Sequence, residues 1–352
     1  MSLRELTMAA RPEFPWLAAG ETVPVEALMA RLHWLRTGEH VLACDRAGEG
    51  NMNLTLRVRT SERSLILKQA RPWVEKYDHI AAPWDRSLVE QRFYQRIASI
   101  HAVAIRMPKI LAADPESRVI LMEDLGTARD FTDVYRGGEI TEGQARELAR
   151  YLRALHEVTE EDEPDPVLAN RDMRALNHAH IFEIPLRADN GVALDNYELW
   201  LDREAETLRK DREFCRKMAT LGKRYLADGH SLLQGDFFPG SWLRVGDDIK
   251  VIDPEFCFYG DAEYDLAIAV AHFRMARKSQ DLVHEFLKAF SGRDLAVRYD
   301  APLLAQYAAA EVTRRLLGVA QLPIPPTEGF RAELLHGARA AMLDETWEAM
   351  WK

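Results

Sequence analysis

Asp236 stands at a point in the sequence where an acid is able to do chemistry. It follows the apolar run "LLQG" and precedes the turn "FFPGS", which ends at Ser241. An acid at such a break can accept a hydrogen bond from a substrate hydroxyl and take its proton as the oxygen attacks. Ser241 is close enough in sequence to help hold a divalent ion. Taken alone, Asp236 would be interpreted as a turn-forming or helix-capping residue.

A second pair of acids follows the apolar run "IKVI". Asp253 and Glu255 are separated by one proline, which fixes the local backbone. Two hard oxygen donors at this spacing suit Mg²⁺, which prefers a few carboxylates together with phosphate oxygens. Because this pair comes soon after the first acid, the combination favours a catalytic site over two unrelated turns.

A glycine turn and a strand lysine lie in the first third of the chain. Gly48 and Gly50 precede a predicted strand, and glycines let backbone N–H groups approach a phosphate closely. A plain hairpin turn is the alternative. Lys68 lies within the apolar stretch "LILKQA", where an inward-facing ammonium needs a partner such as a phosphate or the carboxylate of Glu90. An edge-strand lysine facing water is the alternative there.

The elements that must position these residues change character along the chain. Residues 53–60 and 64–70 read as two antiparallel strands joined by the turn "SER", residues 85–100 as a helix, and residues 117–126 as a buried strand. After Gly126 the pattern becomes mainly helical. A capping box, Thr141 to Gln144, opens the first helix. Further helical patterns cover residues 197–227, 262–276, 302–321 and 328–350, with short strands around the turn "GDD".

Composition narrows the class of protein. The chain has 352 residues, which is more than a domain with one hydrophobic core usually contains, so we expect two lobes. A formal net charge of −10 argues against nucleic-acid binding, which needs a basic face. The three cysteines have no metal-ligand or disulfide spacing, and no stretch approaches the ~20 apolar residues of a membrane span. These features predict a cytoplasmic protein that binds neither nucleic acid nor membrane.

Together, these motifs resemble a known family. The segments "GEGNMNL", "LKQARPW", "DRSLVE", "LMEDL", "GDFFPGS", "IDPEFCFYG" and "EVTRRLLG" are similar, in order and spacing, to those of the aminoglycoside phosphotransferase and choline kinase group. The chain most resembles the 5-methylthioribose kinases in that group, because aminoglycoside kinases usually have Asn in place of Ser241 and Asp in place of Glu255. The resemblance covers residues 40–320.

The resemblance implies an α+β, protein-kinase-like two-lobed fold and an ATP-dependent, Mg²⁺-dependent kinase with a small-molecule hydroxyl as acceptor. An antiparallel-sheet ATP-binding lobe with an N-terminal helical extension would span residues 1–125, and a mainly helical catalytic lobe would span residues 126–352. Asp236 would be the catalytic base, and Asp265 would anchor its loop. By the same resemblance, the nucleotide would contact Gly48, Gly50, Asn51, Asn53, Lys68, Glu90, Met122, Glu123 and Leu125; the metal would contact Ser241, Asp253 and Glu255; and the acceptor would contact Phe238, Tyr259, Arg314 and Arg315.

The chain also departs from the methylthioribose kinase pattern. Gln234 stands where a histidine is usual, and it can still hold the loop by hydrogen bonds. Phe238 replaces a polar ring, and Asp261 and Glu263 add negative charge. An aminoglycoside, choline or amino-alcohol kinase therefore stays an alternative, as does a nucleotide-binding protein without catalysis. Arg314 and Arg315 could also lie on a solvated helix face. The resemblance suggests a possible homodimer and leaves the preference between ATP and GTP open.

Overall fold

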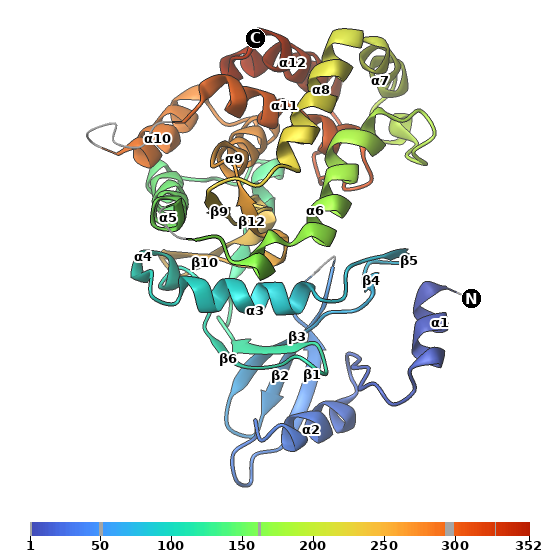
Figure 1. The fold of residues 1–352 in the computed structure, drawn as a ribbon, viewed down its shortest axis with the longest axis vertical. Coiled ribbons are helices and arrows are strands. Elements are labelled where there is room, and N and C mark those ends of the chain that lie inside the picture. Colours follow the sequence, from blue (N-terminus) through green and yellow to red (C-terminus); the bar gives the residue numbers. More distant parts are fainter. Residues whose placement is uncertain (1, 49–51, 161–162, 293–298, 328) are drawn as a thin grey trace. The chain divides into compact units, whose positions relative to one another are not determined.

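The predicted hairpin of the first third forms the middle of an antiparallel sheet in a computed structural model of the chain. The structure describes residues 2–48, 52–160, 163–292, 299–327 and 329–352 (Figure 1). Strands β2 (Leu54–Thr60) and β3 (Ser64–Gln69) pair in register from Leu54 with Gln69 to Arg59 with Ser64. The sheet order is β1-β2-β3-β7-β6, with β1 at Val41–Arg46, β6 at Ile110–Asp114 and β7 at Val119–Glu123.

The chain divides into two compact units, residues 1–128 and 129–352. The predicted boundary after Leu125 lies close to this division, and the roles assigned to the two lobes stay predictions. The α+β class, with an antiparallel sheet in the first unit and mainly helices in the second, is confirmed.

The alternation of β2 and β3 explains how the first unit is built. Leu56, Val58 and Leu67 point to one face, where they pack with residues of helix α2 (Thr22–Arg31) in a buried core. Lys68 therefore points to the other face, toward helix α3 (Arg86–Ile97). The unit also contains α1 (Leu3–Ala10), α4 (His101–Ala104), β4 (Trp73–Val74) and β5 (Tyr77–Ala81).

The second unit is built around two almost completely buried helices, α9 (Glu263–Met275) and α11 (Ala301–Leu317), which pack against each other. A helix that is buried all round belongs in the centre of a helical unit. The surrounding helices are α5 (Glu142–Glu160), α6 (Arg171–His178), α7 (Leu201–Lys210), α8 (Arg212–Tyr225), α10 (Gln280–Ser291) and α12 (Phe330–Asp344). None of the helices in the described residues has the length and apolarity to cross a bilayer.

Two small sheets carry the loops of the second unit. Strands β10 (Trp242–Val245) and β11 (Asp248–Val251) form the predicted hairpin, and β8 (Arg129–Asp130) pairs with β10. Strand β9 (Ser231–Leu233) pairs with β12 (Phe258–Gly260). The loops after β9 and β11 contain the predicted catalytic and metal-binding acids.

Sequence and structure differ in the helices. The capping box at the start of α5 is confirmed, since Thr141 and Gln144 exchange backbone-to-side-chain hydrogen bonds. The single helical pattern predicted over 197–227 is wrong, because α7 ends at Lys210 and Asp211 caps a new helix by accepting from the N–H groups of Glu213 and Phe214. The pattern predicted to reach residue 350 ends at Asp344 and continues as a 3-10 turn.

Candidate active site

A buried carboxylate on α9 holds the loop that presents Asp236. Asp265 accepts hydrogen bonds from the backbone N–H groups of Gln234 (2.8 Å) and Gly235 (3.0 Å), and His156 Nε2 lies 3.0 Å from it. The Asp265 side chain is completely buried. Hydrogen bonds of this kind satisfy a buried carboxylate and fix the backbone that donates them. Asp265 therefore anchors the loop, as expected from the sequence.

Gly235 allows the loop to approach the chain after β11. Its φ is +85°, and a Cβ there would lie 2.1 Å from the backbone oxygen of Phe256. Side chains are strained at such a φ and have no room at such a distance. Only glycine fits this position.

Gln234 ties the two loops together. Its Oε1 accepts from the backbone N–H of Asp236 (2.9 Å), and its Nε2 donates to the carbonyl oxygens of Ile252 (2.9 Å) and Asp253 (3.3 Å). An amide has both an acceptor and donors, so it can make all three bonds at once. The departure from histidine at this position thus leaves the loop held.

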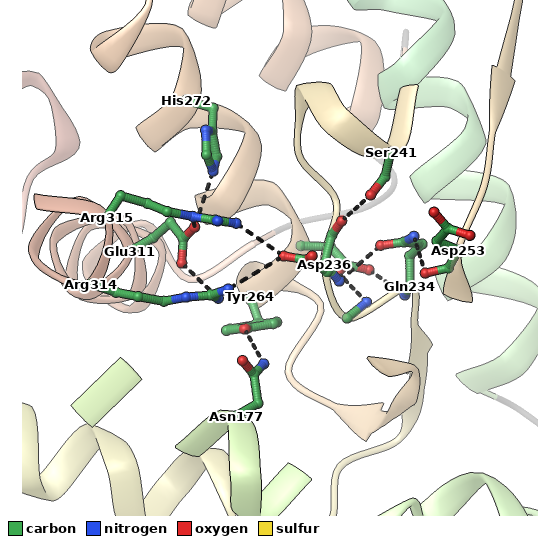
Figure 2. Close-up of polar contacts among 12 residues, drawn as sticks. Asn177, Gln234, Asp236, Ser241, Asp253, Tyr264, His272, Glu311, Arg314 and Arg315 are labelled. Atoms are coloured by element: carbon green, nitrogen blue, oxygen red, sulfur yellow. Dashed lines mark hydrogen bonds and ion pairs between the residues drawn. The ribbon is translucent and has the colours of Figure 1, made fainter. Parts of the chain in front are cut away.

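The side chain of Asp236 faces two arginines on α11. Its Oδ1 lies 3.2 Å from Nη2 of Arg315 and 3.8 Å from Nη2 of Arg314, and Figure 2 shows both guanidinium groups extending toward it. Asp236 has 17% of its side chain exposed, and the arginines have 6% and 8%. Burial raises the pKa of the Asp236 carboxyl, although Arg315 and Arg314 act in the opposite direction. The alternative of a solvated helix face for the arginines is wrong.

Behind the arginines lies a second carboxylate, Glu311. It contacts both guanidinium groups and Nε2 of His272, whose Nδ1 contacts the hydroxyl of Tyr135. Burial lowers the pKa of His272 to about 4, against the influence of Glu311. Burial would raise the pKa of Glu311, but Arg314 and Arg315 outweigh it and hold that pKa far below its usual range.

Phe238 packs on the arginine side of the loop. The guanidinium carbon of Arg315 lies 4.6 Å from the centre of its ring, and the ring of His272 lies at 5.4 Å. A cation over an aromatic face is attracted by the ring's quadrupole. The apolar ring thus supports Arg315 directly, and its contact with an acceptor stays a prediction.

The predicted metal ligands are all oxygen donors, which fits a hard cation such as Mg²⁺. Asp253 is half-buried and has a left-handed backbone (φ +58°), an uncommon conformation for a residue other than glycine. Glu255 is buried, with its backbone oxygen held by Asn170. The hydroxyl of Ser241 donates to the backbone oxygen of Asp236 (2.9 Å), so its oxygen also faces this loop (Figure 2).

In the first unit, Lys68 is paired and buried. Its Nζ lies 2.7 Å from Oε2 of Glu90 on α3, and the two side chains are 5% and 1% exposed. Strand β3 is internal to the sheet, between β2 and β7. The edge-strand alternative for Lys68 is therefore wrong, and the expected pairing with Glu90 is present.

The glycine turn is only partly described. Gly50 and Asn51 lie outside the described residues, whereas Gly48 has a φ of +77°, which favours glycine. Asn53 is buried, and its Oδ1 accepts from Nε of Arg86 (2.8 Å), whose Nη2 donates to the backbone oxygen of Met52 (2.8 Å). No pattern in the sequence marks Arg86, yet it holds the end of this turn to α3.

The segment predicted to meet adenine covers the end of strand β7 and the turn after it. Met122 is buried, and Oε1 of Glu123 accepts from the backbone N–H of Lys109 (2.8 Å). Asp124 accepts from the N–H of Gly126 and pairs with Arg57, so the turn after the strand is braced. The contacts of Met122, Glu123 and Leu125 with a nucleotide stay predictions.

Three further residues of the second unit, Tyr259, Asp261 and Glu263, make contacts that do not involve the Asp236 cluster. Tyr259 is buried on β12, and its hydroxyl has no hydrogen-bond partner among the described residues. Asp261 pairs with Arg224 (2.9 Å) and accepts from the hydroxyl of Tyr307. Glu263 accepts from the backbone N–H of Asp300 (2.7 Å). The two additional acids are thus engaged in structural contacts.

A sheet unit with a buried Lys–Glu pair and a helical unit with an anchored aspartate loop define a protein-kinase-like architecture. The chain belongs to the phosphotransferase enzyme family, whose sequence profile matches residues 44–308. The resemblance to small-molecule kinases is thereby confirmed. Membership implies ATP and, typically, a divalent metal ion.

Individual relatives agree with this family. A methylthioribose kinase of Exiguobacterium sibiricum is 28% identical over 256 residues, which cover 68% of this chain and 62% of that protein, so the match spans less than two thirds of the relative. The fold is similar to that of a microcompartment-associated aminopropanol kinase (TM-score 0.56, 15% identity, 93% of this chain and 99% of that one). It is also similar to choline kinase LicA from Streptococcus pneumoniae (TM-score 0.53, 12% identity, 91% and 98%).

Proposed function

We propose that the chain transfers the γ-phosphoryl group of ATP to a hydroxyl of a small molecule, and that this acceptor is a methylthioribose-like sugar. Family membership and the methylthioribose kinase relatives support this class of reaction. The observation that carries the proposal is the placement of Asp236, a partly exposed carboxylate on a fixed loop with two guanidinium groups beside it.

Asp236 would act as the base for the acceptor hydroxyl. Its loop is fixed by Asp265, so the carboxylate is oriented before a substrate binds. Phosphoryl transfer develops negative charge on the transferred oxygens, and positioned cations stabilise that charge. Arg314 and Arg315 would supply such cations. The buried Nε of Arg314 has no hydrogen-bond partner among the described residues, which fits a donor that serves a ligand.

The first unit would bind the nucleotide. Lys68, held by Glu90, would contact the α- and β-phosphates, and the turn with Gly48, Gly50, Asn51 and Asn53 would lie along them. The backbone of residues 122–125 would meet adenine. Asp253, Glu255 and Ser241 would hold Mg²⁺, which when bound neutralises phosphate charge.

A neutral sugar is favoured over an ammonium-bearing acceptor. The two guanidinium groups beside Asp236 already supply the counter-charge of its carboxylate, so a cationic acceptor would meet no unpaired negative charge there. Asp261 and Glu263, which could have attracted such an acceptor, are engaged by Arg224 and by the backbone of Asp300. The negative charge of Asp261 and Glu263 therefore no longer favours an amino alcohol or an aminoglycoside as the acceptor.

The test is Mg²⁺-dependent ATP turnover with methylthioribose, choline, homoserine and an aminoglycoside as acceptors, with Asp236→Asn beside the wild type. Turnover with methylthioribose alone, abolished in the variant, supports the sugar kinase and its base. Turnover with a cationic acceptor instead contradicts the sugar assignment and retains the kinase. ATP binding without any phosphorylated product contradicts the kinase and supports a binding protein. Repeating the assay with GTP decides the nucleotide preference.

We further propose a cytoplasmic homodimer, as the resemblance suggests. All three cysteines, Cys44, Cys215 and Cys257, are free thiols, which suits a reducing compartment. Sedimentation velocity of the purified chain measures the oligomeric state, and a single monomer species across concentrations would contradict the dimer.

A further inference from the structure

Glu311 lies behind the arginine pair, on the side away from the catalytic loop. Its side chain is 2% exposed. Oε2 lies 3.2 Å from Nη1 of Arg314, and Oε1 lies 2.6 Å from Nε of Arg315. Arg314 and Arg315 follow Glu311 by three and four positions on α11, and this spacing places their side chains next to that of Glu311. One carboxylate thus binds both guanidinium groups.

Each arginine is consequently held at two places. Arg315 contacts Glu311 through Nε and Asp236 through Nη2, and Arg314 contacts them through Nη1 and Nη2. A guanidinium group is planar and rigid, so fixing one edge determines where the remaining N–H groups point. Glu311 therefore sets the direction in which the two Nη2 groups face Asp236 (Figure 2).

Glu311 is itself held by a histidine. His272 Nε2 lies 3.0 Å from Oε1 of Glu311, and the hydroxyl of Tyr135 contacts Nδ1. A carboxylate can only accept, so Nε2 carries the proton, and Nδ1 then accepts from the Tyr135 hydroxyl. These contacts define one neutral tautomer of His272, which is completely buried. The lowered pKa of His272 agrees with a neutral ring.

The charges of the cluster balance. Asp236 and Glu311 carry two negative charges, Arg314 and Arg315 carry two positive charges, and His272 is neutral. Removing one partner of a buried ion pair leaves its counterpart uncompensated. Without Glu311, both guanidinium groups would be free to turn onto Asp236, the group that has to receive the acceptor's proton.

We infer that Glu311, oriented by His272 and Tyr135, is a positioning residue that holds Arg314 and Arg315 for phosphoryl transfer and acts on the reaction only through them. This inference rests on the proposed function. Glu311 contacts no reacting group itself. Its effect on turnover thus depends on the arginines being present.

A double-mutant cycle tests this dependence. Glu311→Gln keeps the side-chain shape and removes the charge, and we expect kcat to fall about tenfold or more while the KM for ATP changes less than about twofold. In an Arg315→Gln background, the same change should cost less than about threefold, because its main partner is already lost. Equal losses in both backgrounds would overturn the inference, as would an unchanged kcat in Glu311→Gln.

The outer surface supplies a matched control. Glu204 pairs with Nε2 of His336 at 2.9 Å, but the histidine is 68% exposed. Glu204→Gln removes the same kind of carboxylate–imidazole contact and should leave kcat unchanged. If Glu311→Gln does not fold, Tyr135→Phe replaces it, because it removes only one hydroxyl. We then expect a fall of about two- to fivefold in kcat that disappears in the Arg315→Gln background.

A spectroscopic measurement separates this inference from the proposed function. In ¹⁵N-histidine-labelled protein, the resonances absent from His272→Gln belong to His272, and they should report the neutral Nε2–H tautomer at pH 7. Glu311→Gln and Tyr135→Phe should each shift them. A mixed or protonated ring in the wild type would overturn the arrangement. If the tautomer is present and wild-type protein turns over no acceptor, the proposed function has failed, and the catalytic role of Glu311 falls with it.

Discussion

Arg315 on α11 and Asp236 on the loop after β9 lie 3.2 Å apart although they are 79 positions apart in sequence. This contact joins the candidate base to one of the two buried central helices of the second unit. It links the protonation of the acid to a charge on a separate element, which gives a measurable pH effect.

The acidic limb of the profile of kcat/KM against pH should report the protonation of Asp236. A base works when deprotonated, so kcat/KM should fall as the pH drops through its pKa, which burial raises above the usual aspartate value. Arg315 opposes that rise, and therefore Arg315→Gln should move the limb to higher pH by roughly one unit. Arg187→Gln, on an exposed pair with Glu183, is the control. A limb at the same pH in Arg315→Gln would rule out this coupling.

His272 should make the fold sensitive to acid. Its folded pKa of about 4 lies below the unfolded value, so between those values only the unfolded state is protonated. The neutral ring contributes its full share to the free energy of unfolding above about pH 6.5. As the pH falls toward 4, this contribution of roughly 3 kcal/mol is lost. His272→Gln should flatten this dependence in urea titrations at several pH values. Parallel curves for wild type and variant would contradict the assignment.

Gly235→Ala should damage the catalytic loop. A Cβ would meet the backbone oxygen of Phe256 at a φ of +85°, so we expect about 2 kcal/mol or more of lost stability and a fall in kcat of at least about tenfold. Gly246 offers a matched control, since its φ is +60° and nothing lies within 4 Å of an added Cβ. Gly246→Ala should cost about 1 kcal/mol and leave kcat unchanged. Thermal unfolding and steady-state rates measure both, and equal behaviour of the two variants would refute the steric argument.

Arg86→Lys should weaken nucleotide binding. The guanidinium group of Arg86 holds Asn53 and Met52 at the end of the glycine turn, and a lysine cannot make the same set of bonds. We expect the dissociation constant of ATP, measured by calorimetry, to rise about tenfold. Arg59→Lys, in an exposed pair with Asp45, should bind ATP like the wild type. Unchanged ATP affinity in Arg86→Lys would show that the contacts of Arg86 with the glycine turn do not affect nucleotide binding.

The local patterns of the sequence predict the local parts of this structure. The alternation of residues 54–69 predicts the hairpin, and the apolar run before Asp236 predicts a strand that ends at the loop. Lys68 and Glu90 could be paired in advance because a buried ammonium needs a carboxylate or phosphate. Such inferences need only neighbouring residues and the energetic cost of burying charge.

The contacts behind Asp236 could not be predicted in this way. Tyr135 and His272 are 137 residues apart, and His272 and Glu311 are 39 apart. The packing of α9 against α11 brings His272 and Glu311 together, and Tyr135 reaches His272 from a separate segment that precedes α5. A partial signal exists for Glu311, because it precedes Arg315 by one helical turn. The role of Asp211 is hidden for another reason, since a capping aspartate within a continuous helical pattern cannot be told from a surface acid.

The four-charge cluster has a consequence for how such a site can diverge. Arg314, Arg315, Glu311 and Asp236 share contacts, so the effect of a substitution at one of them depends on the residues at the other three. Losing one arginine leaves a buried carboxylate, Glu311, and a partly exposed one, Asp236, with a single counter-charge. The order in which substitutions arise then decides whether a lineage stays functional. Epistasis of this kind predicts that new acceptor specificities evolve here by concerted replacement of the cluster, and that single steps through it are selected against.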